Sequence, residues 1–207
     1  MPVVYAYAQT NSAGPACLLP DDEGGGWLAG QHLASLGRSC VAHITGPERF
    51  TAVRERRLGL VQALAAAGHG LDPRLSLTGP WSEAWGREAA VRLLEGGVPF
   101  DAVFCGSDQI ARGVGDMLRE RGKRVPEDVA LVGYDNWEII AAATQPPITT
   151  VDPCLEDLGR QAAMRLLGMI DGSGAEVGPE PQRIPCRLVV RQSCGGQPRL
   201  QAAERAA

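Results

Sequence analysis

Residues 101–150, DAVFCGSDQIARGVGDMLRERGKRVPEDVALVGYDNWEIIAAATQPPITT, predict the fold class of this chain. They open with a short apolar run, Asp101–Cys105, that predicts a buried strand, and a second such run lies at Val129–Gly133. Between them, residues from Gln109 to about Arg121 have the pattern of a helix, which a glycine then ends. A strand, a helix and another strand in this order indicate a parallel sheet with helical crossovers.

Polar residues follow both of these strands at the point where each strand ends. Gly106-Ser107-Asp108 comes between the first strand and the helix, and Asp135 comes just after the second strand. We expect Asp108 to cap the helix, because a carboxylate there accepts hydrogen bonds from free backbone amides. Ligands of open α/β sheets bind where strands end and helices begin, so Ser107, Asp108 and Asp135 are expected to face a ligand.

The same alternation of strands and helices extends over the rest of the chain and predicts an α/β fold of parallel sheets flanked by helices. The further strands are expected at Val3–Ala6, Ala16–Leu19, Cys40–Ile44, Leu75–Leu77, Ile148–Val151 and Ile184–Arg191. The further helices are expected from Asp21 to about Leu36, then at Glu48–Ala67, Ser82–Leu94 and Leu155–Ile170. Residues 9–14 and 171–181 are expected to be loops, and residues 196–207 a disordered tail.

The composition excludes several classes of protein. A chain of 207 residues with 44% hydrophobic and 21% charged residues is ordinary for a globular protein. Its net charge of −4 argues against a nucleic-acid-binding surface, which is usually basic. No apolar run is long enough to span a membrane, and the first residues lack the basic region and apolar core of a signal peptide. We therefore expect a cytoplasmic protein with no membrane partner.

The cysteines and histidines give no sign of a metal or cofactor site. The six cysteines are scattered without a C-x-x-C pair, and we interpret them as buried thiols. The three histidines show no ligand spacing, so no zinc site is expected. No G-x-S-x-G motif, phosphate loop or dinucleotide fingerprint accompanies the acidic residues, and we expect no cofactor.

Five further motifs, taken in order with residues 101–150, resemble the effector-binding core of LacI/GalR-type bacterial transcription regulators. They are Gly24–Leu33 (GGGWLAGQHL), Leu36–Arg38 (LGR), Ile44–Pro47 (ITGP), Arg54–Gly59 (RERRLG) and Ile184–Ser193 (IPCRLVVRQS). Each motif is weak alone, and the resemblance rests on their order and spacing. It covers nearly the whole chain, from Pro2 to Ser193.

The resemblance implies a periplasmic-binding-protein-like fold with two subdomains and a cleft between them. The chain is then expected to cross between the subdomains near Pro20–Asp22, Val151–Pro153 and Gln182–Pro185. Residues 21–151 and 183–195 would form a complete C-terminal subdomain. Residues 1–20 and 152–182 would form only part of the N-terminal subdomain.

In the family, the first half of the N-terminal subdomain and a helix-turn-helix DNA-binding domain precede the segment that this chain resembles. Residues 1–20 are expected to be strand and loop, so we expect no helix-turn-helix and no intrinsic DNA binding. The partial subdomain is expected to expose an apolar sheet edge, which favours association. The resemblance also implies a homodimer.

Two charged residues match the family's effector-binding positions. Arg56 lies three residues before Gly59, where the family places an arginine against the effector. Its planar guanidinium suits pairs of hydroxyls or a carboxylate, although a surface arginine on a basic helix remains an alternative. Asp135 is expected to accept hydrogen bonds from sugar hydroxyls or a base edge, with a turn-capping aspartate as the alternative.

Three other positions bear on the ligand. Trp81 matches an aromatic wall of the family's site, although it could instead be a hydrophobic staple before the Ser82 cap. Ser107 replaces a commoner asparagine, so the ligand contacts there would differ. The strand at Val3–Ala6 usually ends in an aspartate in the family, but here that position is Ala6, and the neighbouring Tyr7 is the residue expected to contact the ligand.

These observations lead to three hypotheses of function. The first is a sensor module of a LacI/GalR-type regulator, which binds a small effector between its subdomains and controls operator binding by the helix-turn-helix domain. We expect this effector to be a carbohydrate. The second is a sugar-binding protein of a transport system, which shares the fold but would need export. The third, an enzyme, has only isolated acidic pairs in its favour, and we expect no catalysis.

Overall fold

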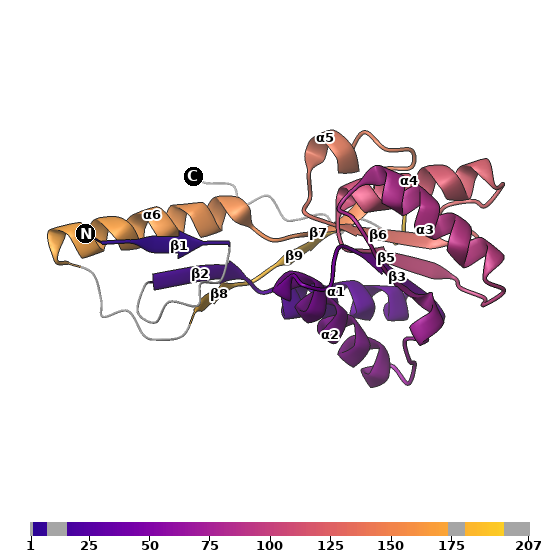
Figure 1. Cartoon of the computed structure of the whole chain (residues 1–207), viewed down its shortest axis with the longest axis horizontal. Coiled ribbons are helices and arrows are strands. Elements are labelled where there is room, and N and C mark those ends of the chain that lie inside the picture. The colour runs from indigo at the N-terminus through magenta and orange to yellow at the C-terminus, as the bar shows by residue number, and fades with distance from the viewer. Residues whose placement is uncertain (1, 8–15, 174–180, 197–207) are drawn as a thin grey trace, which may run out of the picture.

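The computed structural model describes residues 2–7, 16–173 and 181–196, which form two lobes joined by three crossings of the chain (Figure 1). The larger lobe contains a six-stranded sheet in the order β4-β3-β5-β6-β7-β9. The smaller lobe contains a three-stranded sheet in the order β1-β2-β8. The predicted α/β class is therefore confirmed, and the predicted loop at residues 9–14 and the tail from residue 197 lie outside the described residues.

The larger sheet is parallel except at one edge. Its strands are β3 (Val41–Thr45), β4 (Ser76–Thr78), β5 (Ala102–Cys105), β6 (Ala130–Tyr134), β7 (Thr149–Asp152) and β9 (Arg187–Val189). The strand β9 runs antiparallel to β7, with Val151 opposite Leu188. All other neighbours in this sheet are parallel, for example β5 and β6, where Val103 pairs with Leu131.

Helices cover both faces of this sheet because its strands are apolar on both sides. The helices are α1 (Asp22–Ser35) and α2 (Thr51–Ala66) on one face, and α3 (Glu83–Glu95) and α4 (Asp108–Glu120) on the other. In β5, Val103 and Cys105 belong to the core beneath α3 and α4, whereas Ala102 and Phe104 belong to the core beneath α1 and α2. This alternation is the two-residue period of a strand. A short 3-10 turn (Pro73–Leu75) and the short helix α5 (Glu138–Ala141) complete the lobe.

The smaller lobe consists of β1 (Val4–Ala6), β2 (Ala16–Pro20), β8 (Gln182–Ile184) and the helix α6 (Leu155–Asp171). Its strands are parallel, and α6 packs on one face of the sheet through Leu158 against Leu18 and Ile184. The outer side of α6 carries large apolar side chains that are 62–64% exposed, namely Met164, Leu167 and Ile170. The strand β1 lies at the edge of the described sheet.

The predicted last strand, Ile184–Arg191, is wrong as a single element. Its first residue pairs with β2 in the smaller lobe, where Ile184 lies opposite Pro20, and its later residues form β9 in the larger lobe. Pro185 and Cys186 lie between the two strands and carry the chain from one lobe to the other. The chain leaves the larger sheet through β7, passes through α6 and β8 of the smaller lobe, and returns as β9, which runs antiparallel to β7.

A glycine in the first turns of α1 and one on the facing helix α2 allow close packing of the two helices. A Cβ atom added at Gly26 would overlap the carbonyl oxygen of Arg56 on α2. On the facing helix, a Cβ atom at Gly59 would overlap the carbonyl oxygen of Glu23. The absence of side chains therefore lets α1 and α2 approach each other backbone to backbone, which places Arg56 beside the first turn of α1.

The helix α2 begins three residues later than the predicted Glu48. Phe50 has an extended backbone (φ −80°, ψ 131°) and supplies no side-chain cap, and its amide donates to the carbonyl oxygen of Pro47 at 3.1 Å. Residues 48–50 therefore form a turn after β3 rather than the first turn of a helix. This turn carries Arg49 and Phe50 to the carboxyl edge of the larger sheet.

Candidate functional site

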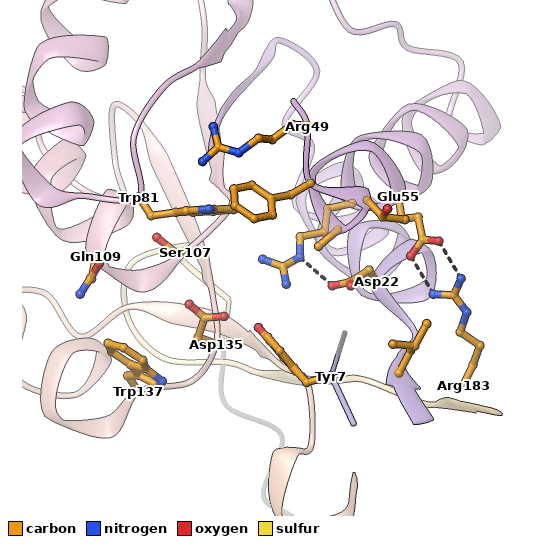
Figure 2. A pocket seen from close by; sticks show the side chains of 15 residues that line it. Tyr7, Asp22, Arg49, Glu55, Trp81, Ser107, Gln109, Asp135, Trp137 and Arg183 are labelled. Carbon is orange, nitrogen blue, oxygen red and sulfur yellow. Dashed lines mark hydrogen bonds and ion pairs between the residues drawn. The ribbon is translucent and has the colours of Figure 1, made fainter. Parts of the chain in front are cut away.

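A pocket of about 550 Å³ lies between the two lobes at the carboxyl ends of the strands of the larger sheet (Figure 2). The smaller lobe contributes Tyr7, Leu19 and Arg183 to its lining. The larger lobe contributes the rest, including four of the predicted site residues: Arg56, Trp81, Ser107 and Asp135. Of the six predicted site residues, only Asp108 is not part of the lining.

Arg56 is buried at the back of the pocket, with 3% of its side chain exposed. Its Nε donates to Oδ1 of Asp22 at 2.7 Å, and its Nη1 donates to the carbonyl oxygen of Gly106 at 2.7 Å. Its guanidinium also lies over the ring of Tyr134, 3.5 Å from the ring centroid. Several of its donors are thus used within the protein, and the alternative of a solvated surface arginine is wrong.

Asp22 and Tyr134 complete this buried network, and sequence reasoning did not assign either of them to the site. The Tyr134 hydroxyl donates to the same Asp22 oxygen at 2.9 Å, and Asp22 lines the pocket. Burial raises the pKa of Tyr134 well above its usual value, so it remains a neutral donor. A buried ion pair needs such additional hydrogen bonds to offset the loss of hydration. The network therefore holds the Arg56 guanidinium in one orientation, directed toward the pocket.

Asp135 differs from Asp22 because no described residue donates a hydrogen bond to its carboxylate. Its backbone φ is +106°, a region that non-glycine residues rarely adopt and that often marks functional sites. Burial raises the pKa of its carboxyl from 3.8 to about 7, an effect that the charge of Arg56 partly offsets. The carboxylate points into the pocket with its acceptor capacity unused (Figure 2).

Asp108 is a structural residue, but it does not cap α4 as we predicted. Its carboxylate is fully buried and accepts from the Thr150 hydroxyl at 2.6 Å and from the Trp137 amide at 2.8 Å. These bonds tie the start of α4 to β7 and to the loop that carries Asp135. Burial raises the pKa of Asp108 to about 6, although both hydrogen bonds favour its charged form. Asp108 thus positions the loop without lining the pocket.

The residue that caps α4 is Ser107. Its Oγ accepts from the amide of Ile110 at 3.2 Å, and its backbone is extended (φ −157°, ψ 161°). A one-residue shift in the start of the helix therefore moves the cap from the predicted Asp108 to Ser107. Ser107 also lines the pocket, beside Gln109 of the first turn of α4.

Aromatic side chains form the walls of the pocket. Trp81 lies beside Phe50, with ring centroids 6.2 Å apart and planes tilted by 53°. The Ser82 hydroxyl after Trp81 caps α3 by accepting from the Trp85 amide at 3.1 Å. Tyr7 enters from the smaller lobe with a left-handed backbone (φ +70°), and burial raises the pKa of its hydroxyl.

A bidentate ion pair joins the lobes at the rim of the pocket. Arg183 of β8 donates from Nη1 to Oε2 of Glu55 at 2.7 Å and from Nη2 to Oε1 at 2.6 Å (Figure 2). Glu55 lies on α2, so the pair links the smaller lobe to the larger one. Its Arg183 side chain is 39% exposed, so solvent screens the pair and it contributes modest stability.

A search of the described residues finds no group of three or more His, Cys, Asp or Glu side chains placed to hold a metal ion. Across the same residues, no helix has the length and hydropathy needed to cross a membrane.

The comparison with protein families agrees with this geometry. Residues 31–194 match the model of the periplasmic binding protein-like domain. The chain belongs to this family, in its LacI/GalR branch. The predicted resemblance and the periplasmic-binding-protein-like fold are thereby confirmed.

Transcription regulators are among the proteins that are similar to this chain. The regulator CelR of Thermobifida fusca is 38% identical over 173 residues, which are 84% of this chain and 50% of CelR. The repressor CytR of Escherichia coli strain K12 is 32% identical over 81% of this chain and 48% of its own length. The chain thus spans about half the length of the curated relatives it matches.

Solved structures of the family superpose closely on this chain. The complex of the regulator CelR with cellobiose has a TM-score of 0.81 and 35% identity over 92% of this chain and 57% of that one. The lac repressor dimer bound to operator and the anti-inducer ONPF has a TM-score of 0.81 and 27% identity, over 93% of this chain and 56% of that one.

Sequence reasoning missed several lining residues of this family member. Asp22 follows the strand β2, and Arg183 lies in the strand β8. Both are close to points where the chain crosses between the lobes, and their side chains line the pocket. The position of Asp22, two residues after Pro20, could have marked it as a residue at a strand end. Phe50 was hidden because we placed it inside a helix.

Proposed function

We propose that this chain is the effector-sensing core of a LacI/GalR-type transcription regulator and that its effector is a carbohydrate. The observation that carries the proposal is the Asp135 carboxylate. It is held in the interlobe pocket without a hydrogen-bond donor among the described residues, opposite the walls formed by Trp81 and Phe50. Such a group is matched by a ligand that brings several hydroxyl donors and an apolar ring face.

The residues of the pocket then have separate roles. Asp135 accepts hydrogen bonds from ligand hydroxyls, and the part of the Arg56 guanidinium that faces the pocket donates to ligand oxygens. Asp22 and Tyr134 hold Arg56 in place, while Asp108 holds the Asp135 loop. The aromatic rings pack against the C–H face of a sugar ring.

Ligand binding between the lobes would change their relative orientation. A ligand shifts such an equilibrium only by as much as its contacts differ between the two orientations. A sugar bound to both Asp135 of the larger lobe and Tyr7 of the smaller lobe favours the orientation in which both can reach it. The three crossings act as the hinge, and the Arg183–Glu55 pair stabilises the approach of the lobes.

In the complete regulator, this change would be passed to a DNA-binding domain. The relatives are named as helix-turn-helix-type regulators, and this chain spans about half of their length. We propose that operator binding belongs to the other part of such a protein, that the protein works in the cytoplasm, and that it acts as a homodimer. The related lac repressor is a dimer on its operator. We also propose that the pocket binds its ligand without catalysis.

The proposal is tested by thermal unfolding of the chain with a panel of sugars, polyols and nucleosides. A ligand at about a hundred times its Kd adds roughly 2.7 kcal/mol to the free energy of unfolding, which raises the Tm by several degrees. We expect one or more sugars to raise the Tm of the wild type and to lose this effect in Asp135→Asn. The exposed Glu156→Gln serves as the control and should respond like the wild type.

Two results would count against the proposal. If no sugar in the panel changes the Tm while a nucleoside does, the effector is not a carbohydrate. If a sugar stabilises the wild type and Asp135→Asn equally, then Asp135 is not a ligand contact and the role given to it is wrong.

A further inference from the structure

A second hollow adjoins the interlobe pocket on the larger lobe. It has a volume of about 580 Å³ and is lined by Pro47, Glu48, Arg49, Thr78, Gly79, Pro80 and Trp81. These residues form the loops that follow β3 and β4, and we call this surface the β3–β4 shelf. Arg49 and Trp81 line both the shelf and the pocket, so the two hollows share a border.

Trp81 separates the shelf from the pocket. Figure 2 shows its indole edge-on, with Ser107 and Asp135 on one side of the ring plane and Arg49 on the other. Gly46 lies so close to the indole that a Cβ atom there would overlap the ring, which keeps the indole in place. The partly buried ring is thus a fixed partition between the pocket and the shelf.

The polar groups of the shelf are free to bind a ligand. Among the residues that the structure describes, none forms a hydrogen bond or an ion pair with the side chains of Glu48 and Arg49. The Arg49 guanidinium lies over the Phe50 ring, 4.7 Å from its centroid, and its donors remain available. By contrast, Glu55 and Arg183 at the other rim satisfy each other. The shelf therefore offers both an acceptor and a planar set of donors, as hydroxyl pairs require.

We propose that the β3–β4 shelf is a second saccharide subsite and that the effector is a glycan of two or more rings. The first ring occupies the pocket beside Asp135, and the next ring lies past Trp81, where Glu48 and Arg49 bind its hydroxyls. This inference rests on the proposed function, because it names the class of effector for the same site. It adds that a monosaccharide in the pocket leaves Glu48 and Arg49 of the shelf without a ligand contact.

The experiment is isothermal titration of the chain with matched sugar series: glucose with cellobiose and cellotriose, and glucose with maltose and maltotriose. We expect the disaccharide of one series to bind at least tenfold more tightly than glucose. In Glu48→Ala and Arg49→Met, the ratio of disaccharide to glucose affinity should fall about tenfold, since each substitution removes hydrogen bonds to the second ring. Arg57→Met, an exposed arginine on α2 outside both hollows, should keep the wild-type ratio.

The outcomes separate the two proposals. If sugars bind and glucose binds as tightly as every longer member, the shelf is not a subsite, while the carbohydrate function stands. A disaccharide preference that Glu48→Ala and Arg49→Met leave unchanged also contradicts the shelf, because the second ring then lies elsewhere. If no sugar of either series binds while another sugar of the thermal panel does, the shelf proposal is contradicted and the carbohydrate function stands. If no sugar of the panel binds either, both are contradicted.

Discussion

Replacing Asp135 with asparagine should stabilise the protein at neutral and alkaline pH. The carboxyl has a pKa of about 7 in the folded chain and 3.8 in the reference state, because folding buries its charge. A group whose charged form is disfavoured by folding lowers stability as pH rises through the interval between its two pKa values. The loss of folding stability caused by the Asp135 charge should therefore appear above about pH 4, grow until about pH 7 and then remain constant.

The magnitude follows from the shift itself. A difference of about 3 pKa units corresponds to about 4 kcal/mol, since each unit is worth 1.36 kcal/mol. Solvent in the pocket reduces this value, and we expect about 2 kcal/mol above pH 7. An asparagine carries no charge and removes no protein hydrogen bond, because no described residue donates to the Asp135 carboxylate. The variant should thus gain stability while it loses an acceptor for the effector.

The assay is urea unfolding of the wild type and Asp135→Asn at several pH values between 4 and 8.5. The difference in free energy of unfolding should increase with pH and level off above pH 7. Glu156→Gln, which removes an exposed carboxylate on α6, is measured beside it as the control. A pH-independent difference for Asp135→Asn would show that this carboxyl titrates normally, and the argument from burial would be refuted.

Other substitutions test the packing and the hinge. Arg56→Met should destabilise the chain by about 3–5 kcal/mol in urea unfolding, because it leaves the Asp22 carboxylate buried without its cation. In the same assay, Gly59→Ala should lower the free energy of unfolding by more than about 2 kcal/mol, because its Cβ would overlap backbone atoms of α1. Gly159→Ala on α6, where a Cβ meets open space, should raise the free energy of unfolding by up to about 1 kcal/mol. A double-mutant cycle of Arg183→Ala and Glu55→Ala should give a coupling energy of about 1 kcal/mol or less for this ion pair. Loss of the ion pair in either variant should lower the affinity for the effector, measured by titration.

The alternation of apolar strands with helices was sufficient to predict the central strands of the larger lobe. The strands β3, β5, β6 and β7 are buried almost throughout, and each leads into a turn or a helix, so local pattern and tertiary structure agree. The position of Asp135 was predictable for the same reason, since polar residues at strand ends must lie at one edge of a parallel sheet. The prediction of Arg56 and Trp81 as site residues depended on the family resemblance. Arg56 lies within a helix and Trp81 in a loop, and no rule like that for strand ends places such residues at the site.

The remaining features depend on contacts between distant segments. The division of the predicted last strand into β8 and β9 follows from pairing with Pro20 in one lobe and Val151 in the other, which no local pattern reveals. The cap of α4 lies on Ser107 rather than on Asp108 because the helix start differs by one residue from the predicted one, although both residue types favour caps. The buried Asp22–Arg56 pair joins residues 34 positions apart.

The unequal contribution of the two lobes to the pocket has a consequence for signalling. The larger lobe supplies the fixed groups, because Arg56 and the Asp135 loop are each held by buried hydrogen bonds. Contacts that a ligand makes only with this lobe are the same whatever the angle between the lobes, so they add affinity without shifting the equilibrium. Under the proposed function, the coupling then comes from the smaller lobe, whose described lining residues are Tyr7, Leu19 and Arg183. A ligand that satisfies Asp135 but does not reach Tyr7 would bind without signalling, and the residues that decide affinity are then distinct from those that decide the response.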